Sequence, residues 1–130
     1  KIGVELELKK VPAGSFYNFV TDRKQPMIFY VDSPWCPDPG YSLTLYFDSK
    51  SYVNYSNYAN AEVDKLLAEM AATADENVRL AKAKEAQKII MDEAPWTYVT
   101  YPNYTMARKA DLKAWNYYTS NNTRFQDFSR

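Results

Sequence analysis

A chain of 130 residues with 46% apolar and 25% charged side chains is long enough for one domain with a core, and this composition excludes intrinsic disorder as the default. Sixteen basic and sixteen acidic residues cancel, and no long run of one sign occurs, which argues against nucleic acid or an anionic membrane as a partner. The single cysteine excludes an internal disulfide, and the absence of histidine excludes imidazole-dependent catalysis within the chain. Residues 1–5 are typical of a domain interior and not of a signal peptide, so we expect a piece of a longer protein.

The N-terminal part of the chain shows the pattern of a βαβ unit. Apolar residues at positions 2, 4, 6 and 8 alternate with polar or small ones, which predicts a half-buried strand. Ser15 is a suitable N-cap for a short helix with Phe16, Phe19 and Val20 on one side. The apolar run at residues 27–31 is typical of a strand covered on both faces, and the order strand, helix, strand favours a right-handed βαβ connection.

A proline-rich loop follows the second predicted strand. Residues 31–41 contain three prolines and a glycine, so they cannot continue a ladder of backbone hydrogen bonds. Ligands of open α/β sheets bind at the carboxyl ends of strands, and this loop presents Trp35, Cys36, Asp32 and Asp38 there. The alternative is structural: Trp35 covers the edge of the core, and the aspartates cap the next helix.

The second half of the chain is predicted to be mainly helical. A short helix at residues 41–47 and a tyrosine-rich surface or cleft-lining loop at 48–58 precede two amphipathic helices. These begin after the N-cap residues Asn60 and Asp75, and the second ends just before Pro95, so we expect a helical hairpin. Strands are predicted at 96–101 and 104–108. The remainder is unassigned, with Trp115, Phe125 and Phe128 expected to be exposed if they dock on a missing lobe.

These elements together predict an α/β fold for residues 1–130 as a single domain. We expect a central mixed sheet that starts with the βαβ unit and is flanked by helices, followed by the helical hairpin and C-terminal strands.

Several ordered motifs resemble the dipeptide/oligopeptide class, family 5, of extracytoplasmic solute-binding proteins of ABC importers. The motifs span nearly the whole chain, and the order of the set is more specific than any one of them. They are the strand at 2–9, Pro37-Asp38-Pro39, Asn-Tyr-Ser-Asn-Tyr at 54–58, Asn-Ala-Glu-Val-Asp-Lys-Leu-Leu at 60–67, Lys-Glu-Ala-Gln-Lys-Ile-Ile at 84–90, and Ala94-Pro95-Trp96.

The resemblance implies a two-lobed periplasmic-binding-protein-like fold, of which the chain is most of one lobe from the C-terminal part. In peptide-binding members an aspartate of the matching loop binds the peptide amino group. Trp35 holds that place here, with Asp32 three residues earlier and Asp38 three later, so the cargo stays open between a peptide and an opine, a sugar or another solute. The implied ligand wall consists of Asp32, Ser33, Trp35 and Cys36, with Asn54 and Tyr55 as additions.

The resemblance also implies partners and a location. These are a peptide or small-molecule ligand, ABC permease subunits and the remaining lobes of the parent protein, in the periplasm or another extracytoplasmic position. No catalysis and no cofactor are expected. Nickel is a cargo of some relatives, but a chain without histidine gives a metal no support. Cys36 is interpreted as a small buried residue and not as a nucleophile.

Two alternatives remain open. Asp32 and Asp38 could act as the acid and base of a glycosidase-like enzyme, although a proline-rich loop separates them. The chain could also belong to a relative that has lost transport and serves as a sensory or adhesion module.

Overall fold

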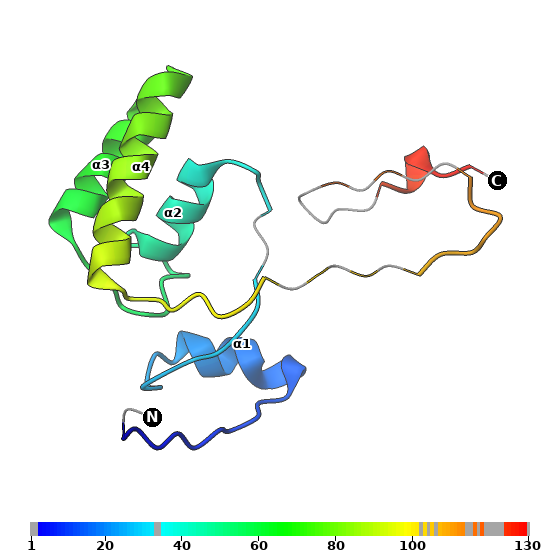
Figure 1. Cartoon of the computed structure of the whole chain (residues 1–130), viewed down its shortest axis with the longest axis horizontal. Helices are drawn as coiled ribbons and strands as arrows, with labels where there is room; N and C mark the ends of the chain where they lie inside the picture. The colour runs from blue at the N-terminus through cyan, green and yellow to red at the C-terminus, as the bar shows by residue number, and fades with distance from the viewer. Residues whose placement is uncertain are drawn as a thin grey trace.

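The fold consists of helices joined by long segments without regular structure (Figure 1). The computed structural model describes residues 3–32, 35–101, 103, 105, 107–113, 116, 118 and 124–129. Its helices are α1 (Ala13–Thr21), α2 (Pro39–Phe47), α3 (Ala61–Ala72) and α4 (Glu76–Glu93), with a single 3-10 turn, η1 (Phe125–Asp127). None of them combines the length and the hydropathy that a membrane span needs, as far as the described residues show.

The predicted α/β fold is wrong, because the described residues form no sheet. Strands were expected at residues 2–9, 27–31 and 96–101, but the described residues of these segments, 3–9, 27–31 and 96–101, take up no strand pairing. The run at 27–31 was predicted to be covered on both faces, yet Met27, Phe29 and Val31 are exposed. Alternation in the sequence indicates which side chains prefer burial. A strand, however, forms only where a neighbouring segment pairs with its backbone, and no described segment pairs with the three predicted strands.

The C-terminal predictions are tested only in part. Lys113 donates its backbone N–H to the Ser129 carbonyl at 3.0 Å. This pairing is isolated, and neither residue belongs to a predicted strand. Tyr104 and Met106 of the predicted strand at 104–108 lie outside the described residues, as do Trp115 and the side chain of Phe125. Phe128 is half-buried.

The helical predictions for residues 41–93 are confirmed with small shifts. α3 follows Asn60, whose side-chain oxygen accepts the N–H groups of Glu62 at 2.9 Å and Val63 at 3.2 Å. α4 follows Asp75, whose carboxylate caps it in the same way, and ends at Ala94 in the left-handed region with φ 48°, directly before Pro95. These N-caps satisfy backbone donors that would otherwise lack partners at the helix starts.

Helices α2, α3 and α4 pack together into a three-helix unit that holds most of the core, and Figure 1 shows α3 and α4 side by side with α2 against them. Each buried large apolar side chain in such a core contributes roughly 1.5–3 kcal/mol. The buried residues of the unit are Leu43, Tyr46, Phe47, Val63, Leu66, Leu67, Met70, Ala83, Ala86 and Ile90.

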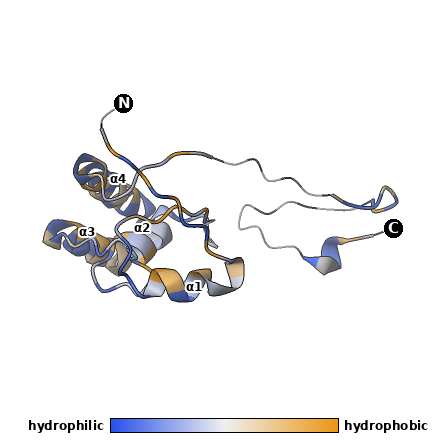
Figure 2. Ribbon diagram, turned by 90° about the horizontal axis from the view of Figure 1, so that it is seen from below, coloured by the Kyte–Doolittle hydropathy of each residue, from blue (hydrophilic) through white to orange (hydrophobic). Residues whose placement is uncertain are grey.

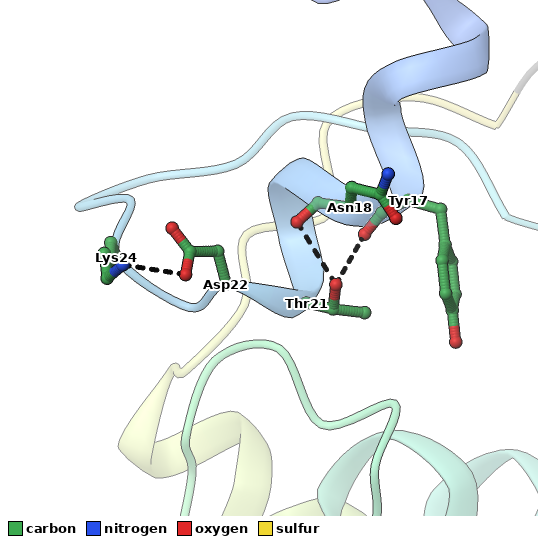
Figure 3. A network of polar contacts seen from close by, with 5 residues as sticks. All are labelled: Tyr17, Asn18, Thr21, Asp22 and Lys24. Atoms are coloured by element: carbon green, nitrogen blue, oxygen red, sulfur yellow. Dashed lines mark hydrogen bonds and ion pairs between the residues drawn. The ribbon is translucent and has the colours of Figure 1, made fainter.

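Helix α1 stands apart from the other helices and packs against none of them within the described residues. It begins at Ala13 after Pro12, so Ser15 is inside the helix and does not cap it as predicted. Figure 3 shows its C-terminal turn, where the Thr21 hydroxyl donates to the carbonyls of Tyr17 and Asn18 and Lys24 pairs with Asp22. Figure 2 shows hydrophobic residues along α1 and along the segment before it.

Candidate functional site

The candidate site is centred on Asp32, which is exposed and lies against helix α2. The Tyr46 hydroxyl donates a hydrogen bond of 2.6 Å to Oδ2 of Asp32. Tyr46 occupies the core-facing side of α2 with Leu43 and Phe47, so the helical unit holds one oxygen of this carboxylate in a fixed place.

Beside Asp32 lies an aromatic cluster, defined here as Phe16, Tyr30, Tyr46, Phe47, Tyr55 and Trp96. Tyr30 is at its centre, with ring centroids 5.9 Å from Phe16, 6.2 Å from Tyr55 and 6.2 Å from Trp96. Trp96 in turn lies 5.1 Å from Tyr46 and 4.9 Å from Phe47. These spacings are those of favourable edge-on and tilted ring contacts, so the cluster joins α1, residues 27–32, α2 and the segment after α4.

The Tyr30 hydroxyl is buried in this cluster without a hydrogen-bond partner in the described residues. Burial, followed by the charges of Asp32 and Tyr55, raises the pKa of Tyr30 to about 12. Burial and then the hydrogen bond to Asp32 raise the pKa of Tyr46, and burial is also the main cause of the raised pKa of Tyr55. The negative charge of Asp32 therefore acts on three tyrosines at once.

We expect these tyrosines to ionise late in an alkaline titration. A folded-state pKa above the unfolded value of 10.0 favours the neutral phenol, so the stabilisation by Tyr30 is complete below pH 10.0 and is lost as the pH rises to about 12. The ultraviolet absorbance of tyrosinate sums over the 12 tyrosines of the chain, so the difference between the wild type and Tyr30→Phe isolates the titration of Tyr30. Asp32→Asn should lower the pKa of all three tyrosines, and an unchanged titration curve would contradict the coupling to Asp32.

Trp35 and Cys36 lie on the surface, three and four residues after Asp32 in the chain. The Trp35 side chain is 78% exposed, so it does not cover the core, and Cys36 is exposed, which makes its interpretation as a buried residue wrong. Ser33 lies outside the described residues.

Asp38 has the structural role that the sequence left as an alternative. Its side chain caps α2 by accepting the Tyr41 N–H at 3.0 Å, and it also forms an ion pair with Arg79 at 2.7 Å. Both carboxylate oxygens are thus engaged inside the fold, which gives no support to Asp32 and Asp38 as a catalytic acid and base.

Of the two predicted additions in the tyrosine-rich loop, Tyr55 faces the site and Asn54 lies within the fold. Tyr55 is half-buried in the aromatic cluster and within the field of Asp32. Asn54 is 1% exposed, and its amide bonds to the backbone of Asp48 and Tyr58. The structure therefore brings Asp32 and Tyr55 together, while the contacts of Asn54 lie within the tyrosine-rich loop.

Sequence reasoning missed three members of the site. Tyr30 was assigned to a covered strand, Tyr46 to a short packing helix and Trp96 to the start of a strand. The available signal was the high count of 12 tyrosines and 3 tryptophans, because such residues combine large contact area with a polar tip that finds a hydrogen-bond partner when buried. No local pattern, however, links positions 30, 46 and 96.

Two further features bear on ligands. An open groove of about 570 Å³ runs along α1 and is lined by Val11, Ser15, Asn18, Phe19, Thr21 and Asp22. Within the described residues, no group of three or more cysteine, aspartate or glutamate side chains is close enough to hold a metal ion.

Comparison with known proteins gives three similar sequences. The chain is 31% identical over 116 residues to the probable D,D-dipeptide-binding periplasmic protein DdpA of Escherichia coli K12, covering 87% of the chain and 22% of that protein. It is 28% identical over 127 residues to the oligopeptide-binding protein AppA of Bacillus subtilis 168, covering 91% of the chain and 22% of AppA. It is 24% identical over 131 residues to the probable di/tripeptide-binding protein 5 of Pseudomonas aeruginosa UCBPP-PA14, covering 98% and 24%.

No family model and no solved structure matches the chain. The chain spans between a fifth and a quarter of the length of the curated relatives, and the matches in turn cover nearly all of the chain. All three relatives are named as peptide-binding proteins, in agreement with the resemblance carried by the ordered motifs. The chain therefore belongs to the dipeptide/oligopeptide class, family 5, of extracytoplasmic solute-binding proteins.

Proposed function

We propose that the chain is the ligand-binding part of one lobe of a solute-binding protein, which captures a peptide or another small solute outside the cytoplasm and delivers it to an ABC permease. The names of the three relatives support a solute of peptide class. Closure of the remaining lobes over the bound solute would signal occupancy to the permease, as hinge closure does in binding proteins in general.

The observation that carries the proposal is the exposed carboxylate of Asp32 beside the aromatic cluster. The Tyr46 hydroxyl fixes one carboxylate oxygen at 2.6 Å, and Trp35 presents an exposed indole three residues further along the chain. A carboxylate pairs with a protonated amine, and aromatic faces attract the same cation while covering apolar groups attached to it. This combination suits the free amino group of a peptide.

Ser33, Cys36 and Asn54 have weaker claims to the ligand wall. Cys36 is exposed next to Trp35 and can line the same surface. Asn54 acts on the wall through the backbone of the tyrosine-rich loop, because its amide is used within the fold.

Native mass spectrometry of the full-length protein, followed by denaturation to release its cargo, tests the class of solute. A series of peptide masses would support the proposal. A single non-peptide mass would replace the peptide by a specialised cargo and make Trp35 its stacking surface.

Calorimetry tests the role of Asp32 with two probes, trialanine and N-acetylated trialanine. We expect Asp32→Asn to weaken trialanine binding about tenfold, or about 1.4 kcal/mol, because the amino group loses its counter-charge. The acetylated peptide should bind weakly to both proteins. Asp92→Asn is the control, since Asp92 is exposed near the end of α4 and lines neither the candidate site nor the groove along α1. Equal affinity of the wild type for both probes would overturn the amine site.

A further inference from the structure

Helix α4 is connected to the surface around Trp35 through one ion pair. Arg79, in the first turns of α4, donates from Nη2 to Oδ2 of Asp38 at 2.7 Å. Both side chains are about two-thirds buried, with exposed fractions of 38% for Arg79 and 32% for Asp38. The pair joins residues 41 positions apart in the sequence, and its partial burial reduces screening by solvent.

The other oxygen of Asp38 fixes the same carboxylate to α2. Oδ1 accepts the Tyr41 N–H at 3.0 Å. A Cβ atom at Gly40 would lie 2.9 Å from this oxygen and 2.9 Å from Cε of Met70 on α3, so the first turn of α2 sits closely between the two. Asp38 is therefore fixed relative to the whole three-helix unit, and Arg79 supplies the contact from α4.

The chain between Asp38 and Trp35 has little freedom. Pro37 has a fixed φ, and a following proline restricts both Cys36 and Asp38 to extended conformations. Asp38 has φ −116° and ψ 124°, in agreement with this restriction. These restrictions leave few backbone angles between Asp38 and Trp35 that could take up a displacement of Asp38.

We propose that Arg79 is a positioning residue for Trp35 and acts through Asp38 without touching the ligand. The inference rests on the proposed function for the role of Trp35 in binding, while the positioning itself can be measured without a ligand. Arg79 holds Asp38 in place, and Asp38 restricts the backbone of the loop segment that carries the exposed indole.

Cys36 provides the probe, because it is the single cysteine of the chain and lies next to Trp35. A nitroxide spin label on Cys36 in the full-length protein, after any further cysteines are replaced by serine, reports the local mobility by electron paramagnetic resonance. We expect Arg79→Met to increase the mobility of the label, and Arg79→Lys to restore part of the order. Circular dichroism checks that helicity is unchanged.

Two matched variants make the test specific. Lys82→Met removes the ion pair of Lys82 with Glu69, one turn along α4, and should leave the label unaffected because that pair does not contact Asp38. Asp38→Asn keeps an N-cap side chain but removes the charge, so it should mobilise the label as Arg79→Met does, with no further increase in the double variant. An unchanged label in Arg79→Met, or an equal effect of Lys82→Met, would overturn the proposal.

Binding by the full-length protein separates this inference from the proposed function. Arg79→Met should weaken binding of the solute released in mass spectrometry by about threefold, since the indole spends less time in its binding orientation. A mobile label combined with unchanged affinity would refute the contact of Trp35 with the solute and support the positioning by Arg79.

Discussion

Replacing Asn54 by alanine should lower the free energy of unfolding by about 3 kcal/mol. The side chain is 1% exposed and connects four groups of the tyrosine-rich loop. Its Nδ2 donates to the carbonyls of Asp48 at 3.1 Å and Tyr58 at 2.7 Å, while its Oδ1 accepts from the Ser56 hydroxyl at 2.9 Å and the Tyr58 N–H at 3.2 Å. Alanine would leave buried polar groups without partners and would open space for which no side chain is available.

Urea unfolding followed by circular dichroism measures this loss. Asn77→Ala is the matched control, because Asn77 is exposed near the start of α4 and alanine is a good helix former there. We expect the control to change the stability by less than about 0.5 kcal/mol. A loss below about 1 kcal/mol for Asn54→Ala would contradict the view that the hydrogen bonds of the Asn54 side chain are the main interaction that stabilises the loop.

Replacing Trp35 by alanine should have the opposite profile, with a large effect on binding and a small one on stability. At 78% exposure the indole contributes little to the core, so the unfolding free energy should change by less than about 0.5 kcal/mol. Binding of the solute identified by mass spectrometry should weaken tenfold or more, on the order of 1.4 kcal/mol, because a stacking or pocket-closing surface is lost.

Calorimetry on the full-length protein measures the affinity, and Tyr52→Ala is the control. Tyr52 is a similarly exposed aromatic residue, 70% exposed, and its carbonyl contact with Arg23 does not involve the ring. Unchanged affinity in Trp35→Ala would remove Trp35 from the ligand wall. A loss of affinity in both variants would indicate a general effect of surface aromatic residues.

The helices could be predicted from the sequence because their signals are local. Asn60 and Asp75 cap the first turns of α3 and α4, and Pro95 stops α4, as the sequence indicated. Each of these interactions involves residues within four positions of one another, so no knowledge of distant parts of the chain is needed. The start of α1 was misplaced because Pro12 precedes the helix where Ser15 was expected to cap it.

The strands could not be predicted in this way, because a strand depends on a partner that the pattern does not name. Residues 4–8 alternate as a strand would, yet Val4, Leu6 and Leu8 are all exposed and pair with no described segment. Periodicity reports a preference for burial on one face, and the preference is satisfied only where another element covers that face.

The candidate site contains residues that the sequence analysis singled out and residues that it did not. The proline-rich loop directs attention to Asp32 and Trp35, because loops on a rigid scaffold often carry binding residues, and their contact with a ligand stays a prediction. The partners that hold Asp32 and surround it, Tyr46 and Trp96, come from elements 14 and 64 residues away in the sequence. Only the packing of α2 and the turn after α4 brings them together.

The exposed rows of aliphatic residues described above have a consequence for handling the chain in the laboratory. Val4, Leu6 and Leu8 form one row, and Met27, Phe29 and Val31 form another, each beside backbone groups that pair with no described segment. Exposed apolar segments with unpaired backbone groups are templates for pairing with other chains, and this association increases with concentration. Expressed by itself, the chain should be soluble only when dilute, and charged substitutions such as Leu6→Lys and Phe29→Lys should improve its yield without disturbing the helices.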